Sequence, residues 1–190
     1  EAIVQTDTRR EQEAVAAWLA RGEGRDLLTL ADADYPPALA ELTDPPPLLY
    51  LHGRRELLQQ PMVATHSNAH TLCPQARNLT DHQLKAFQET QGMIGVNFDT
   101  AFLRADGQRN RQTSLDVILD HIEYLMAHVG EAHVGFGSDF DGGFISQELE
   151  DVTGLPKIVQ HMQRRGYSEN LIHQLCRENW LNTLERIWGK

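Results

Sequence analysis

Strands and helices alternate along residues 61–190, and this alternation constrains the fold more than any other feature of the sequence. Apolar runs at residues 62–64, 93–98 and 133–137 are typical of buried strands. Between residues 114 and 129, apolar side chains recur every three or four positions, which predicts one helix with a single buried stripe. Strands separated by helices in this way form parallel sheets with helical crossovers. The sequence therefore predicts an α/β fold with an open, mainly parallel sheet of about four or five strands.

Other local patterns predict further helices. A capping box at Thr80-Asp81-His82-Gln83 marks a helix start, because the Thr hydroxyl and the Gln amide satisfy each other's backbone donors. Amphipathic patterns predict additional helices at residues 11–19, 155–165, 168–176 and 179–188.

Composition and charge disfavour several functional classes. No apolar run approaches the roughly 20 residues that a membrane-spanning helix needs, so we expect no membrane span. The net charge of −10 makes nucleic acid an unlikely partner, because phosphate backbones bind clustered Lys and Arg. Cys73 and Cys176 form neither a C-x-x-C pair nor a disulfide framework, which predicts a reducing, cytoplasmic compartment. No basic and then apolar leader follows Glu1, so no signal peptide is expected in this sequence.

Proline-rich signals mark the N-terminal part of the chain. A short apolar run at residues 27–30 is followed by Tyr35-Pro36, an expected one-turn helix through Leu42, Asp44-Pro45-Pro46, a strand at residues 48–51, and Gly53. This order, over residues 27–64, resembles the segment preceding the Rossmann domain in the DNA-processing protein A family, which binds single-stranded DNA. That family continues into a Val-Gly-Ser-Arg turn, whereas here Thr65-His66-Ser67 follows, so we expect the main DNA-binding domain to be absent.

Polar side chains follow the predicted strands of residues 61–190. His66 comes just after one strand, Asn97 to Asp99 end the next, and Asp139 follows the third. The carboxyl ends of parallel strands meet at one edge of a sheet, where α/β proteins place ligands and metals. Two simpler alternatives remain open: a histidine bonded to a backbone carbonyl, and an Asp-Gly turn with solvated carboxylates.

A set of short motifs in this part of the chain resembles the carboxyl-terminal half of the membrane (renal) dipeptidase family. The motifs are Ala64-Thr65-His66-Ser67-Asn68-Ala69, Cys73-Pro74, Arg77-Asn78-Leu79-Thr80-Asp81, Gly95-Val96-Asn97-Phe98, Gly137-Ser138-Asp139-Phe140-Asp141-Gly142 and Leu149-Glu150-Asp151-Val152. The resemblance implies half of an eight-stranded, TIM-type barrel in a family that hydrolyses dipeptides with two bridged zinc ions.

The resemblance also implies roles for individual residues. His66 matches a ligand of the second zinc ion, Arg77 matches the group that binds the substrate carboxylate, and Asp139 matches the acid that handles the catalytic water or leaving amine. Each role suits the chemistry of the side chain. Without the family, Arg77 is equally well explained as a surface arginine packed on a loop. His70, four residues from His66 on a hypothetical helical turn, and Asp141 are further candidate metal ligands.

The chain departs from the family where the other zinc ligands belong. It contains no His-x-Asp sequence, and the proline-rich segment replaces the strands expected to carry a bridging Glu and a further His. Catalytic zinc takes about three protein ligands, so the inherited dinuclear site is expected to be incomplete. The sequence thus predicts a hybrid of residues 1–63 and 64–190 in one joint fold, catalytically silent, with a homodimer expected where a sheet edge stays uncovered. The alternatives are a residual zinc dipeptidase, completed by His70 or a partner chain, and a module associated with single-stranded DNA.

Overall fold

The computed structural model describes residues 9–22, 24–36, 40, 45–55 and 61–189. The chain divides into two compact units, Glu1–Gln60 and Pro61–Lys190. The sequence predicts that residues 1–63 and 64–190 come from two different families. This hybrid origin stays a prediction.

The first unit contains one helix and one antiparallel pair of strands. Helix α1 (Arg9–Leu19) forms where the amphipathic pattern predicted it. Strands β1 (Arg25–Thr29) and β2 (Leu48–His52) pair antiparallel, with Arg25 opposite His52. Arg55 forms ion pairs with Asp26 at 2.7 Å and Asp34 at 2.8 Å. The expected one-turn helix through Leu42 falls mostly outside the described residues.

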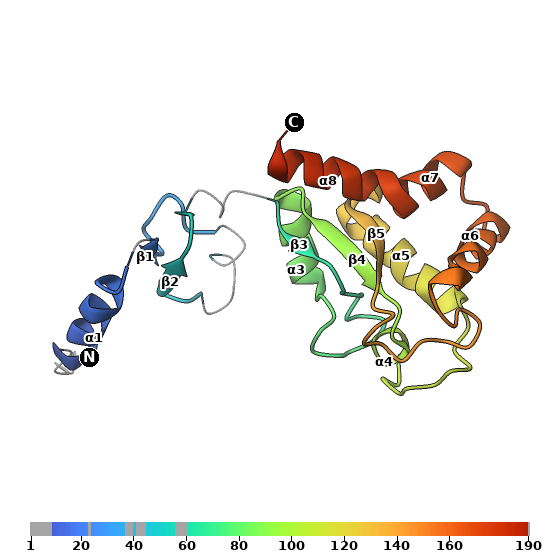
Figure 1. Cartoon of the computed structure of the whole chain (residues 1–190), viewed down its shortest axis with the longest axis horizontal. Coiled ribbons are helices and arrows are strands. Elements are labelled where there is room, and N and C mark those ends of the chain that lie inside the picture. The colour runs from blue at the N-terminus through green and yellow to red at the C-terminus, as the bar shows by residue number, and fades with distance from the viewer. Residues whose placement is uncertain (1–8, 23, 37–39, 41–44, 56–60, 190) are drawn as a thin grey trace. The chain divides into compact units, whose positions relative to one another are not determined.

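The second unit is built on a parallel sheet of three strands in the order β3-β4-β5 (Figure 1). These strands are β3 (Val63–Ala64), β4 (Met93–Asn97) and β5 (Val134–Ser138). Each was predicted as an apolar run, and the open α/β fold class is confirmed. The described strands are divided between two sheets rather than joined in one, because β2 pairs with β1 in the first unit.

Helices connect the strands of the second unit. Helix α3 (Asp81–Glu89) begins with the predicted capping box, in which both reciprocal bonds between Thr80 and Gln83 are present. After β4 come the short α4 (Thr100–Leu103) and the long α5 (Asp116–Val129). The 3₁₀ turn η2 (Glu131–His133) then leads into β5. Helix α5 buries its predicted stripe, and full burial of each such aliphatic side chain contributes about 1.5–3 kcal/mol.

The chain after β5 is helical to its end. A 3₁₀ turn, η3 (Val152–Gly154), precedes α6 (Leu155–Arg164). The helix predicted at residues 168–176 is divided into α7 (Glu169–His173) and a π-helical turn, η4 (Gln174–Glu178), which runs directly into α8 (Asn179–Trp188). Helix α8 matches its predicted range. No described helix is long and apolar enough to cross a bilayer.

One contiguous hydrophobic core lies between the sheet and its helices. Its buried members include Leu84 and Phe87 of α3, Ile94, Val96 and Phe98 in and after β4, the α5 stripe, and Ile158 and Met162 of α6. Because successive residues of a strand point to opposite faces, Gly95 lies on the other face of β4.

Gly95, Gly135 and Gly137 form what we call the glycine face of the sheet. A Cβ atom on Gly137 would lie 2.6 Å from the carbonyl oxygen of Gly95 and would also clash with the carbonyl oxygen of Thr65, which follows β3. A Cβ atom on Gly95 would lie 2.9 Å from the indole of Trp180 in α8. The sheet therefore curls so tightly that the glycine face has no room for a side chain at these positions.

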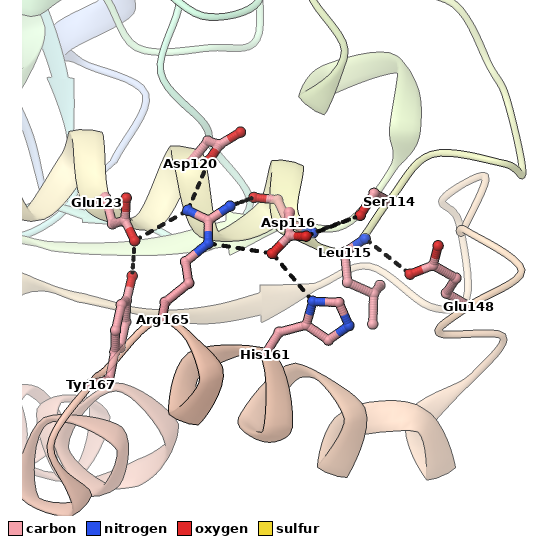
Figure 2. A network of polar contacts seen from close by, with 9 residues as sticks. All are labelled: Ser114, Leu115, Asp116, Asp120, Glu123, Glu148, His161, Arg165 and Tyr167. Carbon is pink, nitrogen blue, oxygen red and sulfur yellow. Dashed lines mark hydrogen bonds and ion pairs between the residues drawn. The ribbon is translucent and has the colours of Figure 1, made fainter.

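A polar network joins α6 and the residues that follow it to α5 (Figure 2). Arg165 forms ion pairs with Asp120 at 2.8 Å, Glu123 at 3.1 Å and Asp116 at 3.3 Å. His161 contacts the same Asp116 carboxylate at 3.2 Å, and its hydrogen bond lowers the pKa of Asp116. The network positions α6 against the polar side of α5, next to the core contacts.

Candidate functional site

His66 lies just beyond the carboxyl end of β3, as the sequence predicted. Its Nδ1 atom is 2.7 Å from the hydroxyl oxygen of Thr65. The next residue, Ser67, donates its backbone N–H to the carbonyl oxygen of Gly95 at 2.9 Å, which ties the turn to β4. The imidazole is thus fixed by a hydroxyl rather than by the backbone carbonyl of the simpler alternative.

Asp139 lies just beyond the carboxyl end of β5. Ser138 and Asp139 both have positive φ angles, 53° and 82°, which are unfavourable for residues other than glycine. The turn is held by the backbone N–H of Gly143, which donates to the carbonyl oxygen of Asp139 at 2.7 Å. The carboxylate accepts a hydrogen bond from Nδ2 of Asn97 at 2.8 Å. The strand end therefore presents a carboxylate of defined orientation.

A pocket of about 500 Å³ brings these two side chains together. It is lined by His66, Ser138, Asp139, Phe140, Asp141, Asp151 and Val152. Asp151 accepts hydrogen bonds from the side chain and backbone of Thr153, which lower the pKa of Asp151 and keep it ionised at neutral pH. Three carboxyl groups and one imidazole, with no Lys or Arg in the lining, suit a cationic group such as an ammonium or a metal ion.

Arg77 and His70 do not line this pocket. Arg77 is exposed, and its guanidinium carbon lies 5.3 Å from the ring centroid of Phe102, a cation–π geometry. The hypothetical helical turn that would place His70 beside His66 is not formed. Ala69 instead forms an isolated parallel bridge with Leu79, and the His70 N–H donates to the Leu79 carbonyl at 2.9 Å. The segment is therefore too extended for the i, i+4 spacing of a helical metal site.

The donor atoms near His66 do not form a complete zinc site on their own. Within the part of the chain that the structure describes, no group of three or more His, Cys, Asp or Glu side chains is arranged to hold a metal ion. His66 is the one imidazole in the pocket lining, and the Asp139 carboxylate is already bonded to Asn97. Although four such side chains line the pocket, no three of them come together as catalytic zinc requires, so the described residues do not fit a dinuclear centre.

Sequence reasoning missed the buried polar residues that support the site. Asn68, Asn97 and His121 are all fully buried. His121 of α5 accepts a hydrogen bond from the Ala69 N–H at 3.1 Å and lies 2.9 Å from the Leu103 carbonyl oxygen. Polar residues beside apolar runs were the available signal for Asn68 and Asn97. His121 lies among the buried apolar residues of its helix, where no local pattern marks a supporting role.

The two cysteines do not act as nucleophiles in this geometry. Cys73 is buried, and burial raises the pKa of its thiol. Cys176 is also a free thiol, and partial burial raises its pKa as well. Both thiols are therefore protonated at neutral pH, which disfavours attack on a substrate.

Proteins of similar sequence cover the second unit. The chain is 52% identical over 128 residues to an uncharacterised protein in the pqqA 5′ region of Klebsiella pneumoniae, covering 67% of this chain and 47% of that protein. It is 30% identical over 128 residues to dipeptidase tcpJ of Claviceps purpurea, covering 67% of this chain and 29% of that protein. The chain thus spans less than half the length of these relatives.

A solved structure of similar sequence also matches this chain. The metallo peptidase from Rhodobacter sphaeroides, crystallised with a phosphinate mimic of the dipeptide L-Ala-D-Ala, matches with a TM-score of 0.67 and 51% identity. The match covers 68% of this chain and 37% of that one. The family model for membrane dipeptidase (peptidase family M19) matches residues 53–188. The matched range begins before the expected hybrid boundary at residues 63/64. The chain therefore belongs to the membrane dipeptidase family, peptidase family M19.

Proposed function

We propose that this chain keeps the dipeptide-binding pocket of an M19 dipeptidase but is catalytically silent on its own. The observation that carries the proposal is the pocket itself, which joins His66 to Asp139 and brings in one imidazole only. A bound zinc ion in such enzymes polarises the scissile carbonyl and lowers the pKa of a bound water. In the described part of the chain, no group of three or more ligating side chains comes together to hold that ion. The sequence also contains no His-x-Asp pair.

The acidic lining of the pocket supports a dipeptide as its ligand. Asp139 and Asp141 provide carboxylates for the free ammonium group of a dipeptide, and Asp139 is positioned to accept or donate a proton. The Rhodobacter relative was crystallised with a mimic of L-Ala-D-Ala, so this dipeptide is the natural first ligand to test. A role for Arg77 in binding the carboxylate requires its guanidinium to leave the ring of Phe102.

Metal analysis and a cleavage assay on the full chain test the silent state. We expect less than one zinc ion per chain after purification in the presence of zinc, and no cleavage of L-Ala-D-Ala with zinc added. The His66→Ala variant removes the imidazole of the pocket, and His128→Ala, whose ring bonds to the Tyr124 carbonyl on α5, is the matched control. Two tightly bound zinc ions, with chelator-sensitive cleavage that His66→Ala abolishes and His128→Ala preserves, would refute the proposal.

A residual zinc dipeptidase is the second candidate function. The 51% identity to a metallo peptidase favours it, and the missing ligands would then come from a partner chain. Activity that depends on two chains rises with the square of protein concentration below the dissociation constant of the dimer. We propose a homodimer because the open parallel sheet leaves strand edges for pairing. Light scattering combined with the concentration dependence of cleavage separates this candidate from the silent chain.

The hybrid origin of the first unit is a further proposal. The segment that resembles DNA-processing protein A, residues 27–64, includes most of the antiparallel pair formed by β1 and β2. Association with single-stranded DNA is disfavoured by the net charge of −10, and a gel-shift assay at low and high salt tests it. The cytoplasm is proposed as the compartment because both cysteines are free thiols.

A further inference from the structure

Asn97 is a buried residue whose side chain contacts the candidate catalytic acid, Asp139, directly. It is the last residue of β4 and is fully buried. Its Nδ2 atom donates to Oδ2 of Asp139 at 2.8 Å, across a sequence separation of 42 residues. A buried amide that donates to a carboxylate holds the orientation of that carboxylate, because leaving the buried amide unpaired is costly.

The orientation of the Asn97 amide is determined by a second hydrogen bond. Its Oδ1 atom accepts from the backbone N–H of Asp99 at 2.7 Å. A backbone N–H can only donate, so the amide oxygen must face Asp99 and the amide nitrogen must face Asp139. Both ends of the amide are therefore hydrogen-bonded, and rotating the amide would break both hydrogen bonds at once.

Asn68 connects the same position to the turn that carries His66. Its Oδ1 atom accepts from the Asn97 backbone N–H at 2.9 Å, and its Nδ2 atom donates to the Asn97 carbonyl oxygen at 3.0 Å. Asn68 is fully buried and follows His66 by two residues. Asn97 is thus bonded both to the acid after β5 and, through Asn68, to the segment after β3.

The strained backbone around Asp139 explains why the hydrogen bonds of Asn97 matter for more than packing. The register between β4 and β5 is shifted at Asn97, and Ser138 and Asp139 adopt positive φ angles. Such conformations are strained and are kept where the surroundings over-determine them. The Phe98 N–H donates to the Ser138 carbonyl at 2.8 Å and holds the backbone, while Asn97 holds the carboxylate.

We propose that Asn97 is a positioning residue, which orients the carboxylate of Asp139 toward the pocket and keeps it in register with His66 through Asn68. The inference rests on the proposed function, because positioning matters only if the pocket binds a dipeptide. Asn97 acts through Asp139 and does not itself need to touch the ligand.

Side-chain amide signals in ¹⁵N-labelled full chain test the contact without any metal or activity. In Asp139→Ala, we expect the hydrogen-bonded amide proton of Asn97 to move upfield, because its side-chain acceptor is gone. The buried Asn78 amide, whose Nδ2 donates to the backbone carbonyls of Cys73 and Phe102, is the control in the same spectrum and should not move. An Asn97 signal that stays where it was in Asp139→Ala overturns the inference, and this readout needs no variant of Asn97.

A double-mutant cycle on binding of L-Ala-D-Ala tests the positioning role. We expect Asn97→Ala to weaken binding about tenfold, the loss of one hydrogen bond to a charged group, and to have no further effect in an Asp139→Ala background. Equal weakening in both backgrounds would mean that Asn97 is merely structural and would overturn the inference. If the unaltered chain binds no dipeptide while the Asn97 signal responds to Asp139→Ala, the contact stands and the proposed function fails.

Discussion

His121 offers the sharpest test of the core as described. It lies on α5 with no exposed surface, accepts the Ala69 N–H at Nδ1, and therefore donates from Nε2 to the Leu103 carbonyl oxygen. This one ring links α5 to the segment after His66 and to the end of α4. Replacing it removes a hydrogen-bond partner from the backbone groups of two buried residues, Ala69 and Leu103.

The cost of His121→Ala follows from these contacts. Each orphaned buried backbone group costs about 1–3 kcal/mol. The cavity left by the ring adds to this cost, because the surrounding core relaxes only partly. We therefore expect the free energy of unfolding of the second unit to fall by about 3–6 kcal/mol. His128→Ala, on the same helix but half-buried and stacked on Tyr124, should cost less than about 1.5 kcal/mol.

The pH dependence of stability provides an independent check. Burial lowers the pKa of His121 below its ordinary value of 6.5, although its bond to Leu103 opposes the shift. Because the folded chain resists the proton that the unfolded chain accepts, the contribution of His121 is complete above about pH 6.5 and is lost as the pH falls below it. The loss approaches about 1.4 kcal/mol per pH unit while the folded form stays neutral.

Urea unfolding in a Trp18→Phe background measures both effects, since Trp180 and Trp188 then report on the second unit alone. Comparing the unaltered ring with His121→Gln, which keeps a neutral donor and acceptor, subtracts the titration of the other eight of the nine histidines. The unaltered protein should lose more stability than His121→Gln between pH 7 and pH 5.5. Equal pH dependence of the two proteins, or a loss below 1 kcal/mol in His121→Ala, would refute the buried, doubly bonded imidazole.

Three further changes test other parts of the second unit by the same urea measurement. Gly137→Ala places a methyl group against the carbonyl oxygens of Thr65 and Gly95, and we expect a loss of about 1–3 kcal/mol or more; no change would contradict the tight curl of the sheet. Thr80→Ala removes the capping-box hydroxyl and should cost about 1 kcal/mol, whereas Thr80→Ser should cost little. Arg165→Gln breaks three partly exposed ion pairs to α5 and should cost about 1–2 kcal/mol, less at high salt, and an unchanged midpoint at low salt would show that the network of Figure 2 is not formed in solution.

Most of the fold of the second unit could be predicted from the sequence, because local patterns determine its elements. The α5 stripe, the capping box at Thr80 and the short apolar runs each specify an element without reference to distant residues. The division of the strands between two sheets could not be predicted, since pairing of β2 with β1 depends on contacts between segments far apart in sequence. The π-helical turn η4 was missed because its residues continue the same amphipathic pattern as α7.

The site was predicted in part for the same physical reason. His66 and Asp139 were placed together because the carboxyl ends of parallel strands meet, and they do line one pocket. His70 does not take the helical position beside His66, because the bridge of Ala69 to Leu79 holds that segment extended. Asn97 was noticed only as part of a strand end. Its bond to Asp139 spans 42 residues and follows from the register shift between two strands, which no local pattern reports.

The glycine face limits how the sheet behind the site can change. Trp180 and the carbonyl oxygens of Thr65 and Gly95 already occupy the space that a methyl group at Gly95 or Gly137 would need. A new ligand preference therefore cannot arise from side chains added at these two positions without first flattening the sheet. Variation must come from the rim, where Phe140, Asp141 and Val152 contribute side chains from loops and a short turn that tolerate replacement.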